Sequence, residues 1–274
     1  MGLIKNSILV IIIVLLITSC KNKKKDFYKT GKIKSVCELN SHNQKNGIEK
    51  IYYETGELMF LQHFKNGKQI DSSLSYYKDG YIQSIIKIKN DSLFCKTFNK
   101  KILTSEGVID SLSRAIGWWN YYTNNEISSK QENIIIKGKS VINRQKVYFE
   151  NKFIFEKSKF YNLIRPNKIE SNNEVLLKFV FNFYEIQKEK NLFGKEYYYL
   201  LVSPEINKDF SNLEGLKLDT IVNKKDQFDF YIKFKKPGIK NIKGIIEKHI
   251  LIKENNKIVI KKSRIYVNEI VNVN

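Results

Sequence analysis

The chain has 274 residues, of which 42% are hydrophobic and 13% aromatic, with only three prolines. This composition excludes a disordered chain and a Pro-rich stalk. The formal net charge is +20, and nearly all of the positive side chains are lysine, since arginine occurs only at Arg114, Arg144, Arg165 and Arg264. Lysine lacks the planar fork that makes bidentate contacts with phosphate or guanine. The lysines are also spread along the whole chain, so the composition argues against nucleic acid. Two alternatives remain: the residue usage of an AT-rich genome, which needs no anionic partner, or a weak attraction to anionic lipid or polysaccharide.

The first twenty residues predict an export signal. Lys5 precedes the unbroken aliphatic run Ile8 to Ile17, and Thr18 and Ser19 lead into Cys20. The run is about half the length of a membrane-spanning helix and fits the apolar core of a signal peptide. This order of segments resembles the signal peptide of bacterial lipoproteins, in which the cysteine is lipidated and becomes the first residue of the mature chain. We therefore expect a cleaved signal peptide at residues 1–19 and a lipid on Cys20.

Residues 20–34 are rich in lysine and predict a solvated tether between the lipid and the first domain. Acidic residues directly after the cysteine, which would resemble the surface-export signal of some Gram-negative lipoproteins, are absent. We expect a chain that is lipid-anchored in the cell envelope and faces the periplasm, in the outer membrane if the cell is Gram-negative.

Two further cysteines, Cys37 and Cys95, leave two alternatives. They form one disulfide, which would stabilise the fold by at most about 4 kcal/mol, or they are separate small buried residues. No pair of cysteines has the spacing of metal ligands.

From Gly47 onward the chain repeats itself. Tyr-Tyr-x-x-Gly occurs at residues 52–56 and again 24 residues later at 76–80, and Asn66-Gly67 lies between the two copies. Gly56, Gly67 and Gly80 predict tight turns with positive φ. A hairpin alone is marginal in water, so a period in the low twenties indicates hairpins that stack and share a core.

This pattern resembles the MORN repeat, particularly the bacterial variant with Tyr-Tyr-x-x-Gly-x-Leu and Phe-x-Asn-Gly-Lys, which is often described as antitoxin-like. Gly-Trp-Trp-Asn-Tyr-Tyr at residues 117–122 is another match, and the resemblance covers about Gly47 to Phe155. In the later copies Asn124-Asn125 and Glu150-Asn151 replace the glycine, and we expect those turns to persist because asparagine tolerates the left-handed conformation. The resemblance implies stacked hairpins and a binding role, without catalytic residues.

The remainder of the chain predicts an antiparallel β-sandwich. Residues 162–173 are turn-rich and form the expected linker between a repeat domain at 35–161 and a sandwich at 174–274. Apolar residues alternate from Leu177 to Phe183 and from Phe228 to Phe234, and about seven short strands in roughly one hundred residues fit a sandwich. The segment from Phe228 onward resembles the later strands of immunoglobulin-like domains in bacterial envelope proteins. The expected fold class is thus mainly β throughout.

No catalytic motif appears in the sequence. The histidines His42, His63 and His249 are far apart, and no nucleophile elbow, phosphate-binding glycine loop or His-Glu-x-x-His motif is present. We therefore expect no enzymatic activity, no cofactor and no metal site.

Trp118, Trp119, Tyr121 and Tyr122 are the candidate partner-binding residues. They form an aromatic platform for a partner, or they alternate between the two faces of a strand so that part of them fills the core. Taken together, the sequence predicts a membrane-tethered envelope lipoprotein that acts as a non-enzymatic binding or scaffold module for an envelope protein or a glycan. The alternatives are an antitoxin or immunity lipoprotein and, ranked below it, an enzyme acting on cell-wall or surface polysaccharide.

Overall fold

The computed structural model describes residues 22–184, 196–223, 226–254 and 257–274. The predicted signal peptide and Cys20 lie outside these residues. The prediction of a mainly β protein is confirmed, because the described residues form strands joined by turns and loops. No helix in this part of the chain is long and apolar enough to cross a membrane. The chain divides into two compact units, Met1–Thr104 and Ser105–Asn274, and each is described by itself.

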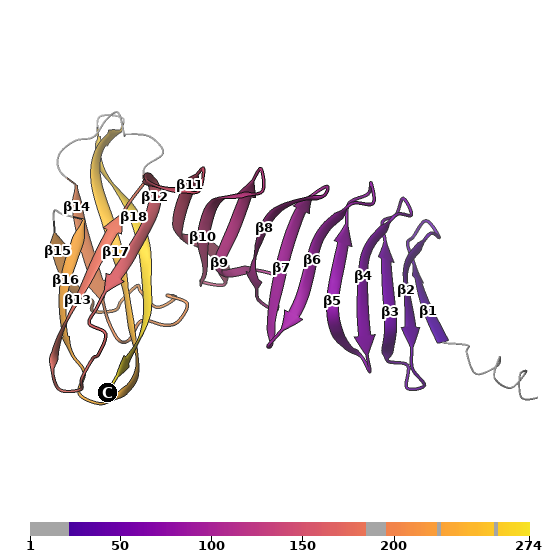
Figure 1. Ribbon diagram of the computed structural model, residues 1–274, viewed down its shortest axis with the longest axis horizontal. Coiled ribbons are helices and arrows are strands. Elements are labelled where there is room, and N and C mark those ends of the chain that lie inside the picture. The colour runs from indigo at the N-terminus through magenta and orange to yellow at the C-terminus, as the bar shows by residue number, and fades with distance from the viewer. Residues whose placement is uncertain (1–21, 185–195, 224–225, 255–256) are drawn as a thin grey trace, which may run out of the picture. The chain divides into compact units, whose positions relative to one another are not determined.

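Hydrogen bonds order the described strands into two sheets (Figure 1). The first sheet has the order β1-β2-β3-β4-β5-β6-β7-β8-β9-β10-β11-β12-β13-β16, and the second has the order β15-β14-β17-β18. The strands of the first unit are β1 (Asn22–Phe27), β2 (Ile33–Leu39), β3 (Lys45–Tyr52), β4 (Leu58–Lys65), β5 (Lys68–Tyr76), β6 (Ile82–Lys89) and β7 (Ser92–Asn99). The unit boundary lies within β8 (Ile102–Ile109).

The remaining strands belong to the second unit. They are β9 (Ala115–Thr123), β10 (Glu126–Ile136), β11 (Lys139–Phe149), β12 (Lys152–Ile164), β13 (Glu174–Asn182), β14 (Tyr197–Val202), β15 (Asp219–Asn223), β16 (Gln227–Lys233), β17 (Gly238–Glu254) and β18 (Lys257–Val273).

Within the first unit, the described strands form a single layer (Figure 1). Without an opposing layer, only a small side chain between longer cross-strand neighbours can be covered on all sides. Five of the six buried residues in the described part of this unit are accordingly small: Ser35, Cys37, Ser73, Ser75 and Cys95. The sixth, Glu49, forms an ion pair with Lys45 at 2.7 Å. Larger apolar side chains such as Leu61, Leu74 and Ile85 are half-buried, and they lie next to one another across β4, β5 and β6.

A recurring tyrosine hydrogen bond connects successive hairpins of the first unit. Each hydroxyl donates to a backbone carbonyl more than twenty residues further along the chain: Tyr28 to Tyr52 (2.6 Å), Tyr53 to Tyr76 (2.8 Å) and Tyr77 to Phe98 (3.0 Å). The same three tyrosines open turns that close on glycines with positive φ: Gly31 (80°), Gly56 (112°) and Gly80 (84°). Each Tyr-Tyr pair therefore takes part in two of these hydrogen bonds: its first residue accepts through the backbone carbonyl, and its second residue donates through the hydroxyl.

The opposite ends of the strands are joined by two-residue turns. Both central residues have positive φ at Asn66-Gly67 (48° and 78°), Asn124-Asn125 (52° and 65°) and Glu150-Asn151 (49° and 61°). This is the backbone of the type I′ hairpin turn, whose twist matches that of the flanking strands. The turns at which asparagine and glutamate replace glycine are therefore present.

The expected tether at residues 20–34 is corrected by the structure. Asn22–Phe27 is strand β1 and pairs with β2 from Asn22 opposite Leu39 to Phe27 opposite Ile33. The lysines of β1 project from an exposed edge strand, where their charges stay hydrated while the backbone is hydrogen-bonded. Their abundance indicated solvation correctly, but solvation of side chains does not require an unpaired backbone.

The disulfide alternative is also corrected. Cys37 on β2 and Cys95 on β7 are both free and buried. Four strands lie between β2 and β7, so five inter-strand steps separate the two cysteines. At about 4.8 Å per step, they are about 24 Å apart. A disulfide needs a Cα–Cα distance of about 4.4–6.8 Å, so this separation excludes one. Each cysteine fills a small buried position instead.

The core of the second unit lies between the two sheets. Leu177, Phe179 and Phe181 on β13 pack with Phe228 on β16 and with residues of β14, β17 and β18. The alternation of β13 produces this face, since every second residue from Val175 to Phe181 is buried while Leu176 remains exposed. The two 17-residue strands β17 and β18 pair along their whole length within the four-stranded sheet.

The expected linker at residues 162–173 lies inside this unit. Asn162 and Ile164 belong to β12, which pairs directly with β13. Ile169 is buried in the core, and its carbonyl accepts a hydrogen bond from the amide of Asn274 at 2.8 Å. The turn-rich composition reflects a loop that packs against the sandwich and is hydrogen-bonded to Asn274, the last residue of the chain. The boundary between the two units falls earlier, after Thr104.

Candidate functional site

Trp118 and Trp119 lie on opposite faces of β9. Trp119 is 6% exposed, its indole Nε1 donates to the carbonyl of Val108 at 2.9 Å, and its ring rests directly on Gly107 of β8. Trp118 is 40% exposed. Adjacent strand residues point in opposite directions, so only one of the two indoles is accessible to a partner.

Tyr121 and Tyr122 divide between the faces in the same way. Tyr121 follows Trp119 at i+2 and is half-buried, and burial raises the pKa of its hydroxyl. Tyr122 donates its hydroxyl to the Glu106 carboxylate at 2.5 Å. Burial, followed by this hydrogen bond, raises the pKa of Tyr122. The four aromatic residues singled out in the sequence therefore do not form one platform, and Trp118 is the member that is most open to solvent.

Cationic side chains from β11 approach Trp118. The Arg144 guanidinium carbon lies 5.1 Å from the centre of a Trp118 ring, and Lys146 Nζ lies 5.7 Å from it. Lys146 Nζ is also 5.8 Å from the ring centre of Phe160 on β12. Lys146 thereby connects Trp118 with a second group of aromatic residues.

That second group is a cluster from the hairpin of β11 and β12. The ring centres of Phe153 and Phe160 are 5.6 Å apart, those of Phe155 and Phe160 are 5.7 Å apart, and Tyr148 lies 5.8 Å from Phe153. Phe153 and Phe155 are 42% and 45% exposed, whereas Phe160 is buried beneath them. With Lys146 they line a hollow of about 280 Å³.

We call Trp118, Lys146, Tyr148, Phe153 and Phe155 the aromatic surface. Its members come from β9, β11 and β12, and β10 lies between β9 and β11 in the sheet. Burial, followed by the charges of Arg144 and Lys130, lowers the pKa of Lys146. A negative group brought beside Lys146 would therefore stabilise an ammonium that its surroundings disfavour.

A part-buried ion pair lies beside Trp118 at one side of the aromatic surface. Arg144 binds Glu132 of β10 through two hydrogen bonds, Nε to Oε2 at 2.6 Å and Nη2 to Oε1 at 2.5 Å, and both side chains are 15% exposed. The guanidinium also lies 4.4 Å from the ring centre of Tyr161, whose hydroxyl donates to Glu269 at 2.6 Å. Arg144 is thus held by Glu132 while it contacts the rings of Trp118 and Tyr161.

A larger cleft of about 720 Å³ also lies in the second unit. Asn143 of β11 contributes to its wall, and its side chain makes both hydrogen bonds with the backbone of Tyr266 on β18, at 2.8 and 2.7 Å. Asp110 binds Arg114 at 2.7 Å, and this hydrogen bond is the main reason that the pKa of Asp110 is lowered. These polar groups join strands to one another, so they are engaged in structural contacts.

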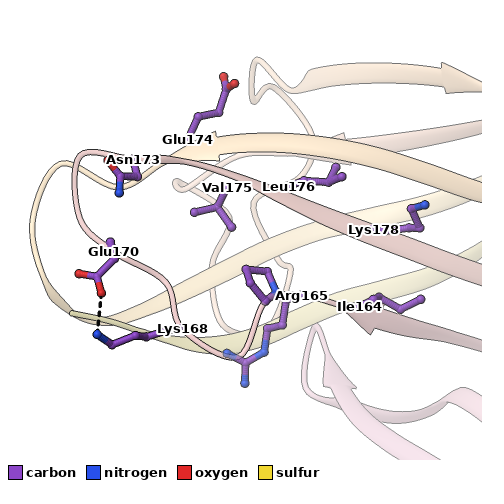
Figure 2. Close-up of a pocket in the computed structure, with 10 residues that line it drawn as sticks. Ile164, Arg165, Lys168, Glu170, Asn173, Glu174, Val175, Leu176 and Lys178 are labelled. Carbon is purple, nitrogen blue, oxygen red and sulfur yellow. Dashed lines mark ion pairs between the residues drawn. The ribbon is translucent and has the colours of Figure 1, made fainter.

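Figure 2 shows a third hollow, of about 660 Å³, between the 165–173 loop and the start of β13. Lys168 and Glu170 form an exposed ion pair at 3.0 Å, while Glu174 points away from them and Lys178 lies at the other end. The side chains do not converge on a common point. This hollow therefore presents no constellation that could act on a substrate.

Glu247, a buried acidic residue of the sandwich, is likewise paired. Glu247 on β17 binds Arg264 Nε at 2.6 Å and His249 Nε2 at 2.7 Å. Burial alone would raise the pKa of Glu247, but the hydrogen bonds from His249 and Arg264 lower it. Among the described residues, no group of histidine, cysteine and carboxylate side chains is placed to hold a metal ion.

The sequence indicated Trp118 but missed Lys146, Tyr148, Phe153 and Phe155. A local signal was present, because aromatic residues stand on both arms of the hairpin around Glu150-Asn151. Their approach to Trp118 could not be read from the sequence, since it depends on how β9, β10 and β11 pair. No protein-family model matches the chain, and the search for similar curated proteins found no match.

Proposed function

We propose that this chain is a non-enzymatic, membrane-tethered envelope lipoprotein that binds a protein partner through its aromatic surface. Cys20 supplies the lipid, and the recurring hairpins, which we interpret as MORN-like repeats, serve as the scaffold that presents the surface. The sandwich is the second, immunoglobulin-like module of this proposal.

The observation that carries this proposal is the half-exposed pair Phe153 and Phe155 over a buried Phe160. Exposed apolar groups that border a hollow are typical of interaction sites. Phe153 and Phe155 offer no hydrogen-bonding group, so we expect an apolar side chain of a protein to pack on them. Aromatic anchors in such hollows commonly dominate the binding energy of an interface.

The charges beside the hollow add a second feature of the partner. Lys146 lies at its rim, and Lys130 Nζ is 5.9 Å from the ring centre of Tyr148. We therefore expect the partner to present an apolar side chain next to a carboxylate. Confinement of both proteins to one membrane layer would raise their effective concentration and allow a modest intrinsic affinity to suffice.

The test compares alanine variants of the aromatic surface with a matched control. Phe149 is 67% exposed and is adjacent to Tyr148 on β11, so it projects from the other face of the sheet. The full-length chain is isolated from its own envelope as wild type, as Phe153→Ala with Phe155→Ala, and as Phe149→Ala. Proteins retained by each are identified by mass spectrometry, and the affinity of the recovered partner is measured.

We expect the double variant to bind its partner about thirtyfold more weakly, which corresponds to about 2 kcal/mol for a central aromatic anchor. Phe149→Ala should bind as the wild type does. Equal affinity of all three proteins, or retention of a glycan in place of a protein, would refute the proposed surface. Turnover of an envelope polymer that one carboxylate substitution abolishes would refute the non-enzymatic role.

The proposed anchor has its own test. Cys20→Ala should release the protein from the membrane fraction without unfolding it, because lipidation at this residue would supply the attachment. If the variant stays in the membrane and its signal segment is not removed, Ile8 to Ile17 is an uncleaved anchor and the lipoprotein assignment fails.

A further inference from the structure

The first hairpin of the first unit concentrates positive charge at the edge of the sheet. Between Asn22 and Lys34 the chain has six lysines and one acidic residue, Asp26, which gives this segment a net charge of +5. All six lysines are exposed: Lys23, Lys24, Lys25, Lys29, Lys32 and Lys34. Asp26 lies 3.6 Å from one of them, Lys24.

The geometry of β1 places its lysines along the outer edge of the sheet. β1 is the first strand in the order of its sheet, so its outer edge faces no other described strand (Figure 1). Successive strand residues alternate between faces, so Lys23 and Lys25 lie on one face and Lys24 lies on the other. A flat negative surface that approaches the edge of β1 therefore meets lysines on both sides of it, together with unpaired backbone amides.

An apolar pair accompanies the lysines. Phe27 and Ile33 face each other across β1 and β2, and they are 56% and 39% exposed. Lysines on an edge strand also discourage pairing with other strands, which would explain the charges alone. That role gives no reason for two exposed apolar side chains among them, whereas a membrane interface accommodates cationic and apolar groups together.

We infer that the edge of β1 is a binding surface for anionic lipid headgroups. The proposed lipid attachment at Cys20 is two residues before Asn22, which spans at most about 7 Å of extended chain. No long tether separates the lipid from this strand, so anchoring would hold the lysines within the range of the headgroup charges. The biological setting of this surface rests on the proposed anchoring.

The test measures the surface without the anchor. The chain beginning at Lys21 keeps every described residue and has no Cys20. Its binding to vesicles of phosphatidylcholine alone is compared with binding to vesicles that also contain phosphatidylglycerol, by co-sedimentation at low and high salt. One variant replaces Lys23, Lys25 and Lys34 by glutamine. The control replaces Lys65, Lys87 and Lys89, three exposed lysines on other strands, and removes the same charge.

We expect binding only to the phosphatidylglycerol vesicles and a decrease as salt rises. The edge variant should bind about a hundredfold more weakly, since each lysine near a charged membrane contributes about fivefold. The control variant should bind nearly as tightly as the wild-type chain. Equal losses in both variants would show adsorption by overall charge, and binding that ignores phosphatidylglycerol would also overturn the inference. Because neither Cys20 nor the aromatic surface takes part, the result is independent of the tests of the proposed function.

Discussion

Gly107 on β8 should be intolerant of any side chain, because Trp119 occupies the space that a Cβ would need. A Cβ built on Gly107 overlaps the Cγ, Cδ1 and Cδ2 atoms of the indole. Gly107 does not have positive φ, so the backbone itself would accept alanine. In Gly107→Ala the indole must therefore move and give up the hydrogen bond from Nε1 to the Val108 carbonyl.

The expected cost follows from three contributions. Overpacking in a tightly packed site costs about 1–3 kcal/mol, and the lost hydrogen bond costs about 1 kcal/mol. Replacing glycine by alanine also lowers the conformational entropy of the unfolded chain, which stabilises the fold by about 0.4–1 kcal/mol. The free energy of unfolding should therefore fall by about 2 kcal/mol.

Fluorescence can report this change locally. The chain has two tryptophans, so a Trp118→Phe background leaves Trp119 as the only indole. Gly107→Ala in this background should shift the emission to longer wavelength, as Trp119 meets water, and should lower the urea midpoint. In a Trp119→Ala chain, followed by circular dichroism, the same glycine substitution should be neutral or stabilising. Unchanged emission and an unchanged urea midpoint for Gly107→Ala in the Trp118→Phe background would refute the packing argument.

Three further outcomes are expected. Glu132→Ala should lower the free energy of unfolding by about 1.5–3 kcal/mol in urea denaturation, because Arg144 loses two charged hydrogen bonds and keeps the 3.8 Å ion pair with Glu269. Adding Arg144→Met should recover part of the loss. An effect below about 1 kcal/mol, as at an exposed pair, would contradict the part-buried ion pair. The pKa of Glu247 is lowered in the folded chain, so its ionisation should stabilise the fold fully above the unfolded pKa of about 4.5, and this stability should be lost as pH falls through the folded pKa. Glu247→Gln should therefore flatten the acid side of a plot of melting temperature against pH. Parallel plots for the wild type and the variant would contradict this. Cys37 and Cys95, whose thiol pKa values are raised by burial, should be alkylated only after unfolding, and a disulfide-linked peptide in mass spectrometry would contradict the free thiols.

The local features of the fold were accessible from the sequence because they depend on neighbouring residues. Asn66-Gly67 specifies its turn by the conformations that its own backbone allows, and alternation from Leu177 to Phe183 specifies a buried strand face by periodicity alone. The recurrence of Tyr52-Tyr53 at Tyr76-Tyr77 indicated the repeat. Its physical cause, a hydroxyl of one hairpin bound to a carbonyl of the next, became visible only in the structure.

Features that depend on which strands pair, and in what order, were beyond the sequence. The lysines of β1 gave the same composition signal as a tether, and only the ladder with β2 distinguishes a solvated strand from a solvated linker. The separation of Cys37 from Cys95 depends on the number of strands between them.

The candidate site shows the same division. The sequence by itself determined that aromatic residues recur at each hairpin and that neighbours such as Trp118 and Trp119 must alternate between faces. The tertiary structure decided which of them meets solvent, and it brought Lys146, Phe153 and Phe155 beside Trp118. The physical reason is that a strand's own residues fix its turns and its alternation, whereas the register and order of strands fix which side chains become neighbours across a sheet.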